Sequence, residues 1–313
     1  NLERRIRMAG AIARAAEMIK AAKTPVIIAG GGVIYSDATD ALRTFAESTG
    51  VGVGVTQAGK ASFPHDHELA LGALGASGSR FANDIAADAD VIIGIGTRYT
   101  DFTTASNTLF RNPDVQFVNI NVAEIDALKE SATPLVGDAR ETLDELLTEL
   151  DGWTAPTESR ARAARNASEW REEIDRIIEL DGSPTLSQGQ MLGILNAAAG
   201  PRDVVINAAG SMPGDLHRLW RPGSTKGYDI EYGNSCMGYE IPGAIGNGLA
   251  DRSRHVFGLI GDGTFLMLSS EILTAVQEHL KITFVVVDNY GYGSIGALSE
   301  VSGAEAFGTR FNE

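Results

Sequence analysis

The sequence predicts an α/β protein with two doubly wound parallel-sheet domains. Short apolar runs rich in Val and Ile recur along its 313 residues, and this composition is typical of strands that are buried on both faces. Between these runs lie longer segments in which apolar residues recur at helical spacing. Alternation of strand and helix indicates parallel sheets joined by right-handed crossovers. The length suits about two domains of ordinary size.

The first domain is predicted over residues 1–152. Its first element is a helix over 4–23, where apolar residues fall near helical spacing and Thr24-Pro25 ends the pattern. The four strands expected next are 26–29, 52–55, 91–95 and 116–120, with helices over 37–48 and 141–150. The run GGGV at 30–33 follows the first strand, but its spacing is not that of a dinucleotide-binding loop. We interpret it as a structural turn.

A linker with a charged helix is predicted over 153–182, because turn residues at 153–158 precede an Ala-rich, charged segment at 160–180. The second domain is predicted over 183–313. Ser187 is expected to cap a helix that runs to Ala199, and a strand is expected over 203–206.

Two further apolar runs in the second domain stop at oxygen-bearing residues. The run 257–260 leads into Gly261-Asp262-Gly263, and the run 282–287 leads into Asp288-Asn289. The segment between them favours a crossover helix over 269–279. Because the carboxyl ends of parallel strands lie at one edge of a sheet, Asp262 and Asn289 are expected to share one divalent ion, Mg²⁺ or Ca²⁺. The backbone carbonyl of Gly291 is a candidate third ligand.

Gly261 and Gly263 lack Cβ atoms, so a bulky anion could approach the main chain there, next to a helix N-terminus that favours negative charge. Gly-Asp-Gly alone is also an ordinary turn, and Asp-Asn-Tyr-Gly an ordinary loop opening. Two such signals at the ends of two buried strands, in the right order, favour a metal and diphosphate site.

These segments resemble the thiamine diphosphate enzymes, whose signature is Gly-Asp-Gly followed by Asn about one crossover later. Residues 234–246 (NSCMGYEIPGAIG) resemble the segment whose apolar side chain, here Met237, bends the cofactor, although core filler is an equally open interpretation of this methionine. Residues 207–214 (NAAGSMPG) resemble the loop that covers the diphosphate. The resemblance implies that the Ser235 carbonyl accepts the cofactor's 4′-amino group.

The cofactor-binding residues that the resemblance and the motifs together predict are Gly210, Ser211, Met212, Ser235, Met237, Gly261, Gly263, Thr264 and Tyr290. The predicted metal ligands are Asp262, Asn289 and Gly291. No catalytic residue is assigned within the chain, since family members take their activating glutamate from a domain expected to precede it.

Within the family, residues 210–220, 231–240 and 269–278 are similar to hydrolases that open a cyclic 1,2-diketone ring in inositol breakdown. This resemblance implies thiamine diphosphate and Mg²⁺ as cofactors, a polyhydroxylated cyclic diketone as substrate, and a homodimer or homotetramer. An acetolactate-synthase-like lyase or transferase acting on 2-keto acids is the alternative. A non-catalytic nucleotide-binding or assembly module is the alternative from another class.

The resemblance also implies which domains of the enzyme this chain contains. Residues 1–152 would be its Rossmann-like middle domain, and 183–313 a C-terminally truncated diphosphate-binding domain. We therefore expect the chain to be a piece of a longer enzyme and to be inactive alone.

The composition argues against several other classes of protein. A net charge of −15 argues against binding to nucleic acid or to an anionic membrane surface. A single cysteine excludes an internal disulfide framework, and no apolar run reaches transmembrane length, so a cytoplasmic protein is expected.

For the other polar side chains we favour solvent-exposed or structural roles over roles in catalysis or binding. His65 and His67 are expected in a solvent-exposed loop, and Cys236 is expected to be a small buried thiol. We place His217, Arg218 and Glu240 on solvated helix faces rather than against a substrate.

Overall fold

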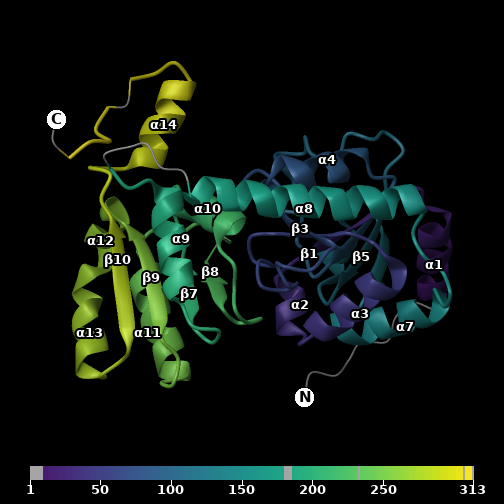
Figure 1. Ribbon diagram of the computed structural model, residues 1–313, viewed down its shortest axis with the longest axis horizontal. Helices are drawn as coiled ribbons and strands as arrows, with labels where there is room; N and C mark the ends of the chain where they lie inside the picture. Colours follow the sequence, from purple (N-terminus) through teal and green to yellow (C-terminus); the bar gives the residue numbers. More distant parts are fainter. Residues whose placement is uncertain (1–9, 180–184, 232, 306, 312–313) are drawn as a thin grey trace. The chain divides into compact units, whose positions relative to one another are not determined.

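The computed structural model describes residues 10–179, 185–231, 233–305 and 307–311. Contacts divide the chain into two compact units, Asn1–Gln190 with His217–Leu219, and Met191–Leu216 with Trp220–Glu313. Each unit is built on one parallel sheet, of six strands in the first and four in the second. The predicted α/β class with two parallel-sheet domains is therefore confirmed (Figure 1).

The sheet of the first unit has the strand order β3-β2-β1-β4-β5-β6, which reverses direction beside β1 as a doubly wound sheet requires. Its strands are β1 (Pro25–Ala29), β2 (Val53–Val55), β3 (Ala70–Ala73), β4 (Val91–Ile95), β5 (Gln116–Asn121) and β6 (Thr133–Val136). Four of these match the strands expected from the sequence, while β3 and β6 were not foreseen. The run GGGV after β1, which we expected to form a turn, instead begins the short helix α2 (Gly31–Tyr35). The N–H of Gly32 donates to the Gly96 carbonyl at 3.0 Å, and a Cβ on Gly30 would overlap that carbonyl, so this run packs closely against the end of β4.

Helices cover both faces of this sheet. They are α1 (Ala11–Ala21), α2 (Gly31–Tyr35), α3 (Thr39–Thr49), α4 (Arg80–Asp88), α5 (Asp101–Thr104), α6 (Glu124–Ala127), the 3-10 turn η1 (Lys129–Ser131), α7 (Ala139–Glu149) and α8 (Thr157–Glu179). Alternate strand residues belong to different cores: Ile27 packs with α1, α3 and α7, and Ile28 packs with α4 and α8. This two-sided burial explains why the strands are apolar throughout. Residues 4–9 of the expected first helix lie outside the described part.

The long helix α8 packs within the first unit. Its buried residues Ala163, Ala167, Trp170 and Ile174 lie three or four positions apart, which places them on one face, and this face contacts β3 and α4. Trp170 lies over Gly72 in β3, where the backbone has a φ of +81° and an added Cβ would overlap the indole ring. The segment that we expected to be a linker thus contributes an apolar face to the first unit.

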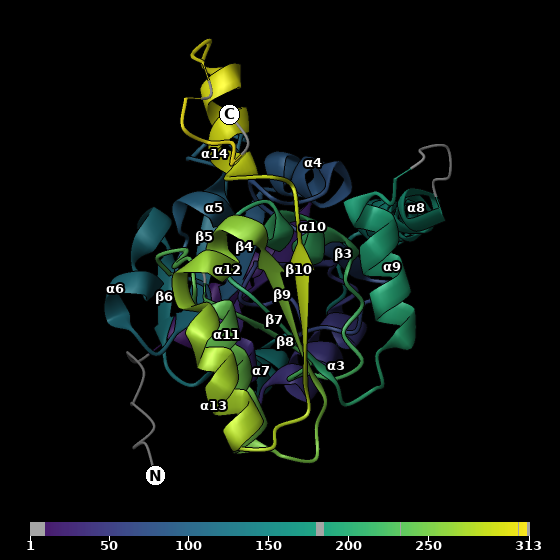
Figure 2. The same cartoon turned by 90° about the vertical axis from the view of Figure 1, so that its left-hand side faces the viewer.

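The sheet of the second unit has the order β10-β9-β7-β8. Its strands are β7 (Val204–Asn207), β8 (Tyr228–Ile230), β9 (Val256–Gly261) and β10 (Ile282–Val287). The helices that follow α8 are α9 (Gln188–Ala198), α10 (Met212–Leu219), α11 (Glu240–Ala250), α12 (Asp262–Leu268), the 3-10 turn η2 (Ser269–Glu271), α13 (Ile272–Gln277) and α14 (Gly293–Val301). The end of α10, His217–Leu219, is part of the first unit. Figure 2 shows α11 and α13 side by side against this sheet. Ser187 caps α9 as expected, since its Oγ accepts from the Gln190 N–H at 3.1 Å.

Two expectations for this unit were wrong in detail. Strand β10 is half-exposed rather than buried on both faces, with Val286 41 % exposed, because it lies at the edge of the sheet. The crossover to β10 is helical from Asp262 onward rather than from Ser269. Nowhere in the described part of the chain is there a helix with the length and hydropathy of a membrane span.

Candidate functional site

The carboxyl ends of three parallel strands meet at one edge of the second sheet. Ile206 in β7 pairs with Gly258 in β9, and Gly261 at the end of β9 pairs with Val287 at the end of β10. The segments that follow these strands therefore emerge at the same edge, where open α/β sheets bind their ligands.

Asp262 joins two of these segments. Its Oδ1 accepts a hydrogen bond from the Gly263 N–H at 2.9 Å, and its Oδ2 accepts from the Gly291 N–H at 2.9 Å. A carboxylate has about four lone-pair sites, so both oxygens keep the capacity to bind a cation. The structure thus brings Asp262 and the loop after β10 together.

Asn289 supplies a second oxygen in that loop. Its Oδ1 is buried and has no hydrogen-bond partner among the residues that the structure describes. Buried acceptors without a partner are rare and costly, and an amide oxygen is a ligand that Mg²⁺ and Ca²⁺ prefer. No cluster of three or more His, Cys, Asp or Glu side chains suited to a metal occurs in the described ranges. A cation here would therefore rely on one carboxylate together with amide, backbone and ligand oxygens.

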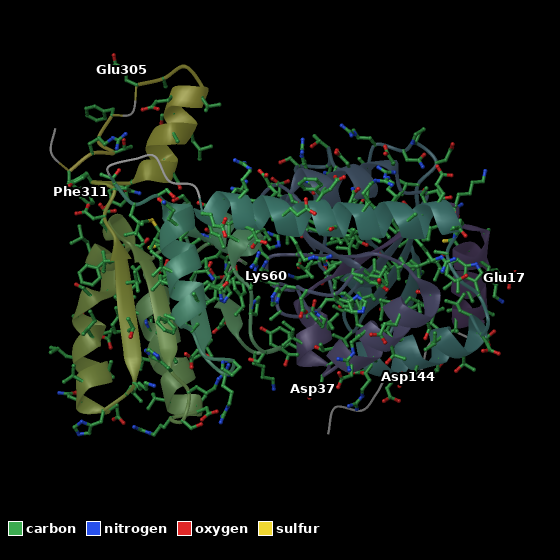
Figure 3. The ribbon with its side chains drawn as sticks, viewed as in Figure 1. Glu17, Asp37, Lys60, Asp144, Glu305 and Phe311 are labelled. Carbon is green, nitrogen blue, oxygen red and sulfur yellow. The ribbon has the colours of Figure 1, made fainter. Side chains whose placement is uncertain are left out.

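A second chain segment fixes the loop after β10. The Tyr292 N–H donates to the Thr309 carbonyl at 2.8 Å, and the N–H of Phe311, the residue labelled in Figure 3, donates to the Tyr290 carbonyl at 3.0 Å. Gly291 lies between them with a φ of +149°, and an added Cβ would overlap the Thr309 carbonyl. Only glycine fits there. The Tyr290 side chain is 60 % exposed.

The two glycines beside Asp262 differ in what their missing Cβ atoms allow. A Cβ on Gly261 would meet nothing within 4 Å, so the main chain there is open to a close approach. A Cβ on Gly263 would lie 2.7 Å from the Tyr292 ring, so this glycine makes room for a protein side chain. The expected role in admitting an anion therefore suits Gly261 better than Gly263. Thr264 is buried in α12.

The segment after β7 has an open turn and a buried methionine. Gly210 has a φ of +86°, and an added Cβ would meet nothing within 4 Å. Ser211 is exposed and precedes α10. Met212 was expected in a loop that covers a diphosphate, but its side chain is only 4 % exposed at the start of α10. Gly210 and Ser211 are thus the accessible part of this segment.

The segment 233–238 is held by a carboxylate whose role the sequence did not reveal. Glu231 accepts hydrogen bonds from the N–H groups of Asn234 at 3.0 Å and Cys236 at 2.8 Å. Partial burial would raise the pKa of Glu231, but these hydrogen bonds outweigh it, and the pKa is lower than usual. An acidic residue just before a Gly-Asn-Ser turn is a signal that could have suggested these hydrogen bonds from the turn to a carboxylate.

Within this segment, Met237 is 38 % exposed, which disfavours the core-filler interpretation. Ser235 has a positive φ of 51°. Cys236 is exposed, so the expectation of a buried thiol was wrong; its hydrogen bond to the Glu231 carboxylate raises the pKa of the thiol.

Glu240 is not on a solvated helix face, as we had expected. It is 1 % exposed at the start of α11, and its Oε1 accepts from the Ala209 N–H at 3.2 Å. Burial raises the pKa of this carboxyl above its usual range. Glu240 thereby connects the segment after β7 with the start of α11.

His217 is also buried, because its ring enters the core of the first unit. A carbonyl can only accept, so Nε2 donates to Val55 O at 2.8 Å, and Nδ1 accepts from Ser77 Oγ at 3.0 Å. Burial, with a smaller contribution from the charge of Lys60, lowers the pKa of His217 to about 3. The solvated-face interpretation is wrong for this residue too.

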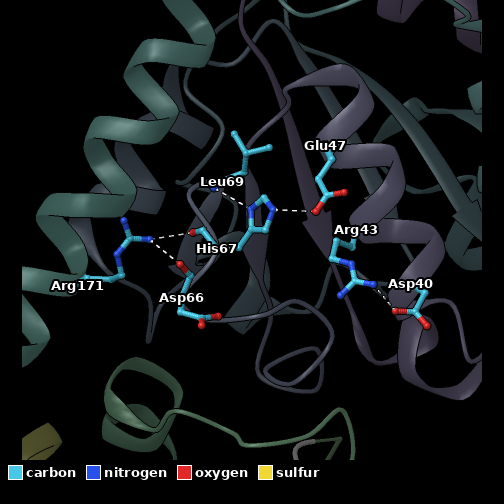
Figure 4. A network of polar contacts seen from close by, with 7 residues as sticks. All are labelled: Asp40, Arg43, Glu47, Asp66, His67, Leu69 and Arg171. Carbon is cyan, nitrogen blue, oxygen red and sulfur yellow. Dashed lines mark hydrogen bonds and ion pairs between the residues drawn. The ribbon is translucent and has the colours of Figure 1, made fainter.

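His67 has a structural role in the first unit (Figure 4). Its Nδ1 accepts from the Leu69 N–H at 3.1 Å, so Nε2 faces Glu47 Oε1, 3.2 Å away, as the donor. The Arg171 guanidinium donates to the His67 carbonyl at 2.9 Å. His67 is therefore occupied in fixing its loop, whereas His65 is exposed as expected.

Comparison with known proteins gives the family. Two family models match the chain: the thiamine pyrophosphate enzyme central domain over residues 12–146, and the C-terminal TPP binding domain over residues 208–312. Thiamine pyrophosphate (TPP) and thiamine diphosphate are the same compound. The second match includes the segments after β7, β9 and β10.

Individual relatives share one name. The 3D-(3,5/4)-trihydroxycyclohexane-1,2-dione hydrolase of Clostridium tetani is 40% identical over 327 residues, which cover 96% of this chain and 50% of the relative. The hydrolase of the same name from Bacillus thuringiensis is 40% identical over 334 residues, covering 99% of this chain and 52% of the relative. The chain spans about half the length of these curated relatives. With both domain models and these relatives in agreement, the chain belongs to the thiamine pyrophosphate enzymes and contains their central and TPP-binding domains.

Proposed function

We propose that this chain carries the metal and diphosphate site of a thiamine diphosphate- and Mg²⁺-dependent hydrolase. The enzyme would cleave the carbon–carbon bond between the two carbonyls of 3D-(3,5/4)-trihydroxycyclohexane-1,2-dione and open the ring to 5-deoxy-glucuronate. The observation that carries the proposal is the meeting of the Asp262 carboxylate with Gly291 and the Asn289 loop at the ends of β9 and β10. The name of the 40% identical relatives supports the substrate.

In this proposal the chain's own residues bind and orient the cofactor. Asp262, the Asn289 Oδ1 and the Gly291 carbonyl would hold Mg²⁺, which in turn binds phosphate oxygens. The open main chain at Gly210 and Gly261 would face the diphosphate. Thiamine diphosphate supplies the electron sink for carbon–carbon bond cleavage, and the protein supplies position and electrostatics.

The segment 233–238 would orient the other end of the cofactor. The exposed Met237 would lie against it, and the Ser235 carbonyl would accept its 4′-amino group. Glu231 braces this segment through the N–H groups of Asn234 and Cys236, so that the Ser235 carbonyl is held between two fixed amides.

The other residues predicted to bind the cofactor would have less direct roles. Tyr290 is exposed at the metal loop and would border the site, whereas the buried Met212, Gly263 and Thr264 would act through packing. The activating glutamate is proposed to come from outside this chain, in a cytoplasmic homodimer or homotetramer of the whole protein.

An assay of the intact protein tests the proposal. It would be incubated with thiamine diphosphate, Mg²⁺ and either the cyclic dione or pyruvate, and the products would be separated and identified. Ring opening of the dione without pyruvate turnover is the expected result. Pyruvate turnover without ring opening would instead establish the 2-keto-acid lyase.

Calorimetric titration with thiamine diphosphate and Mg²⁺ separates both enzymes from the third alternative. Failure of the intact protein to bind would leave a non-catalytic module as the better account.

A further inference from the structure

Glu240 is a buried carboxyl group that no part of the proposed chemistry yet uses. Its side chain is enclosed at the first residue of α11, 1 % exposed. Oε1 accepts the Ala209 N–H at 3.2 Å, one residue before the open turn at Gly210. Oε2 is buried and has no hydrogen-bond partner among the residues that the structure describes. One carboxyl oxygen thus fixes the segment after β7, and the other accepts no hydrogen bond from the described residues.

The surroundings of Glu240 offer little to stabilise a negative charge. The elements packed against α11 are β7, β9, β10, α12, η2 and α13, and none of them contains Lys, Arg or His. Their titratable side chains are both acidic, Asp262 in α12 and Glu271 in η2. The next titratable side chain beyond Gly210 is also acidic, Asp215 in α10. Burial accordingly raises the pKa of Glu240, and only backbone N–H groups such as that of Ala209 oppose it.

We propose that Glu240 is a positioning residue of the diphosphate site: its carboxyl holds the segment after β7 at Ala209 and takes up a proton when the diphosphate anion binds beside Gly210. This inference rests on the function proposed above. The contact with Ala209 survives protonation, because the C=O oxygen of a neutral carboxyl group still accepts a hydrogen bond.

Electrostatics gives the direction of the effect. Two negative charges close together in a water-poor site disfavour each other's ionised form, so a bound diphosphate favours the neutral state of Glu240. Protonation also turns the unpartnered Oε2 from an acceptor into a donor, which suits a neighbouring anion rich in acceptor oxygens. Cofactor binding is therefore linked to proton uptake, and affinity falls at pH values where Glu240 must first be protonated.

Calorimetry on the intact protein measures this uptake directly. Thiamine diphosphate with Mg²⁺ would be titrated into the wild type and into Glu240→Gln, in two buffers of different ionisation enthalpy, over a series of pH values. Above the pKa of Glu240, the wild type should take up as much as one more proton per site than the variant. Its dissociation constant should rise there by up to about tenfold per pH unit relative to the variant.

Glu271→Gln is the matched control, because it neutralises a carboxyl group on an element that packs against α11, and that carboxyl group bonds to Thr274 rather than to Ala209. It should keep the wild-type proton count. Protons released by the diphosphate itself are common to all three proteins and cancel in the comparison. A merely structural role for Glu240 would change the unfolding temperature of Glu240→Gln but not the difference in proton count.

Equal proton counts for the wild type and Glu240→Gln at every pH would overturn the inference while leaving the cofactor site in place. Absence of binding by the wild type would reject the proposed function itself. If Glu240→Gln does not fold, infrared difference spectra of the wild type with ¹³C-labelled glutamate provide the readout. A protonated carboxyl band that grows on cofactor binding supports the inference, and its absence rejects it.

Discussion

The Asp262 carboxylate accepts a hydrogen bond from the Gly291 N–H at 2.9 Å, which ties the residue after β9 to the loop after β10. The same loop contains the buried Asn289 Oδ1, which lacks a partner within the described residues. Because both segments start from strands in parallel register, this edge of the sheet is organised before any cation binds. Preorganised ligands lose less freedom on binding, which favours a functional role for the arrangement.

Replacement of Asp262 by Ala should weaken the binding of thiamine diphosphate and Mg²⁺ to the intact protein. The change removes the only carboxylate of the proposed metal site together with its hydrogen bond to Gly291, and loss of such a charged contact costs roughly 2 to 5 kcal/mol. Calorimetric titration gives the affinity. Asp251→Asn serves as the control, since Asp251 precedes β9 and so lies at the opposite end of that strand. Unchanged affinity in Asp262→Ala would remove the metal assignment.

Asn289→Ala should lower the stability of the protein relative to the wild type only when the ligands are present. Without them, the change deletes a buried acceptor that has no partner among the described residues, so the free energy of unfolding should stay within about 1 kcal/mol of the wild type or rise. With Mg²⁺ and thiamine diphosphate present, the wild type gains a metal contact that the variant lacks. Urea unfolding in both conditions measures the two effects. A variant that is equally destabilised in both would indicate that Asn289 is structural.

Much of this site could be predicted from the sequence, because strand ends and oxygen-bearing residues leave a local pattern. Asp262, Asn289 and Gly291 were singled out in this way, and the structure brings Asp262 and Gly291 into contact. Strand β8 (Tyr-Asp-Ile) and, in the first unit, strands β3 and β6 were not foreseen, because they lack that pattern. Strand β3 reads Ala-Leu-Gly-Ala, without β-branched residues, and β6 includes Pro134, which is common only at sheet edges.

Burial of polar side chains was the part that the sequence could not predict. Glu240 and His217 stand in segments that look amphipathic, yet both are enclosed and hydrogen-bonded to backbone groups far away in the sequence. Their partners Ala209 and Val55 contribute only main-chain atoms, so no residue type identifies them. Such contacts become visible only when the fold is known.

His217 should make the stability of the first unit depend on pH. Its pKa is lowered to about 3 in the folded protein from 6.5, mainly by burial, with added effects of the Lys60 and Arg218 charges. The unfolded chain therefore binds a proton below pH 6.5 that the folded protein does not, and the stabilising contribution, complete above pH 6.5, is lost as the pH falls. Each pH unit in this window costs up to about 1.4 kcal/mol.

Urea unfolding at pH 7, 6 and 5 would measure the effect in the wild type and in His217→Gln. The glutamine amide can still donate to the Val55 carbonyl and accept from Ser77, but it does not titrate. The variant should therefore lose less stability than the wild type on acidification, and other groups cancel in the difference. Parallel losses in the two proteins would show that His217 does not titrate as inferred.

Gly72→Ala should destabilise the first unit more than Gly152→Ala does. Both glycines have positive φ, +81° and +70°, so either substitution should cost about 1–2 kcal/mol in backbone strain. At Gly72 the new methyl group also meets the Trp170 indole, whereas at Gly152 nothing lies within 4 Å. Overpacking of this kind adds about 1–3 kcal/mol. Comparing the free energies of unfolding of the two variants isolates the steric contribution of Trp170.

A double-mutant cycle with Trp170→Ala tests the same contact. Removing the indole should reduce the cost of Gly72→Ala to about that of Gly152→Ala, because only the backbone strain then remains. If Gly72→Ala costs the same with and without Trp170, the indole is not what excludes a side chain at this position.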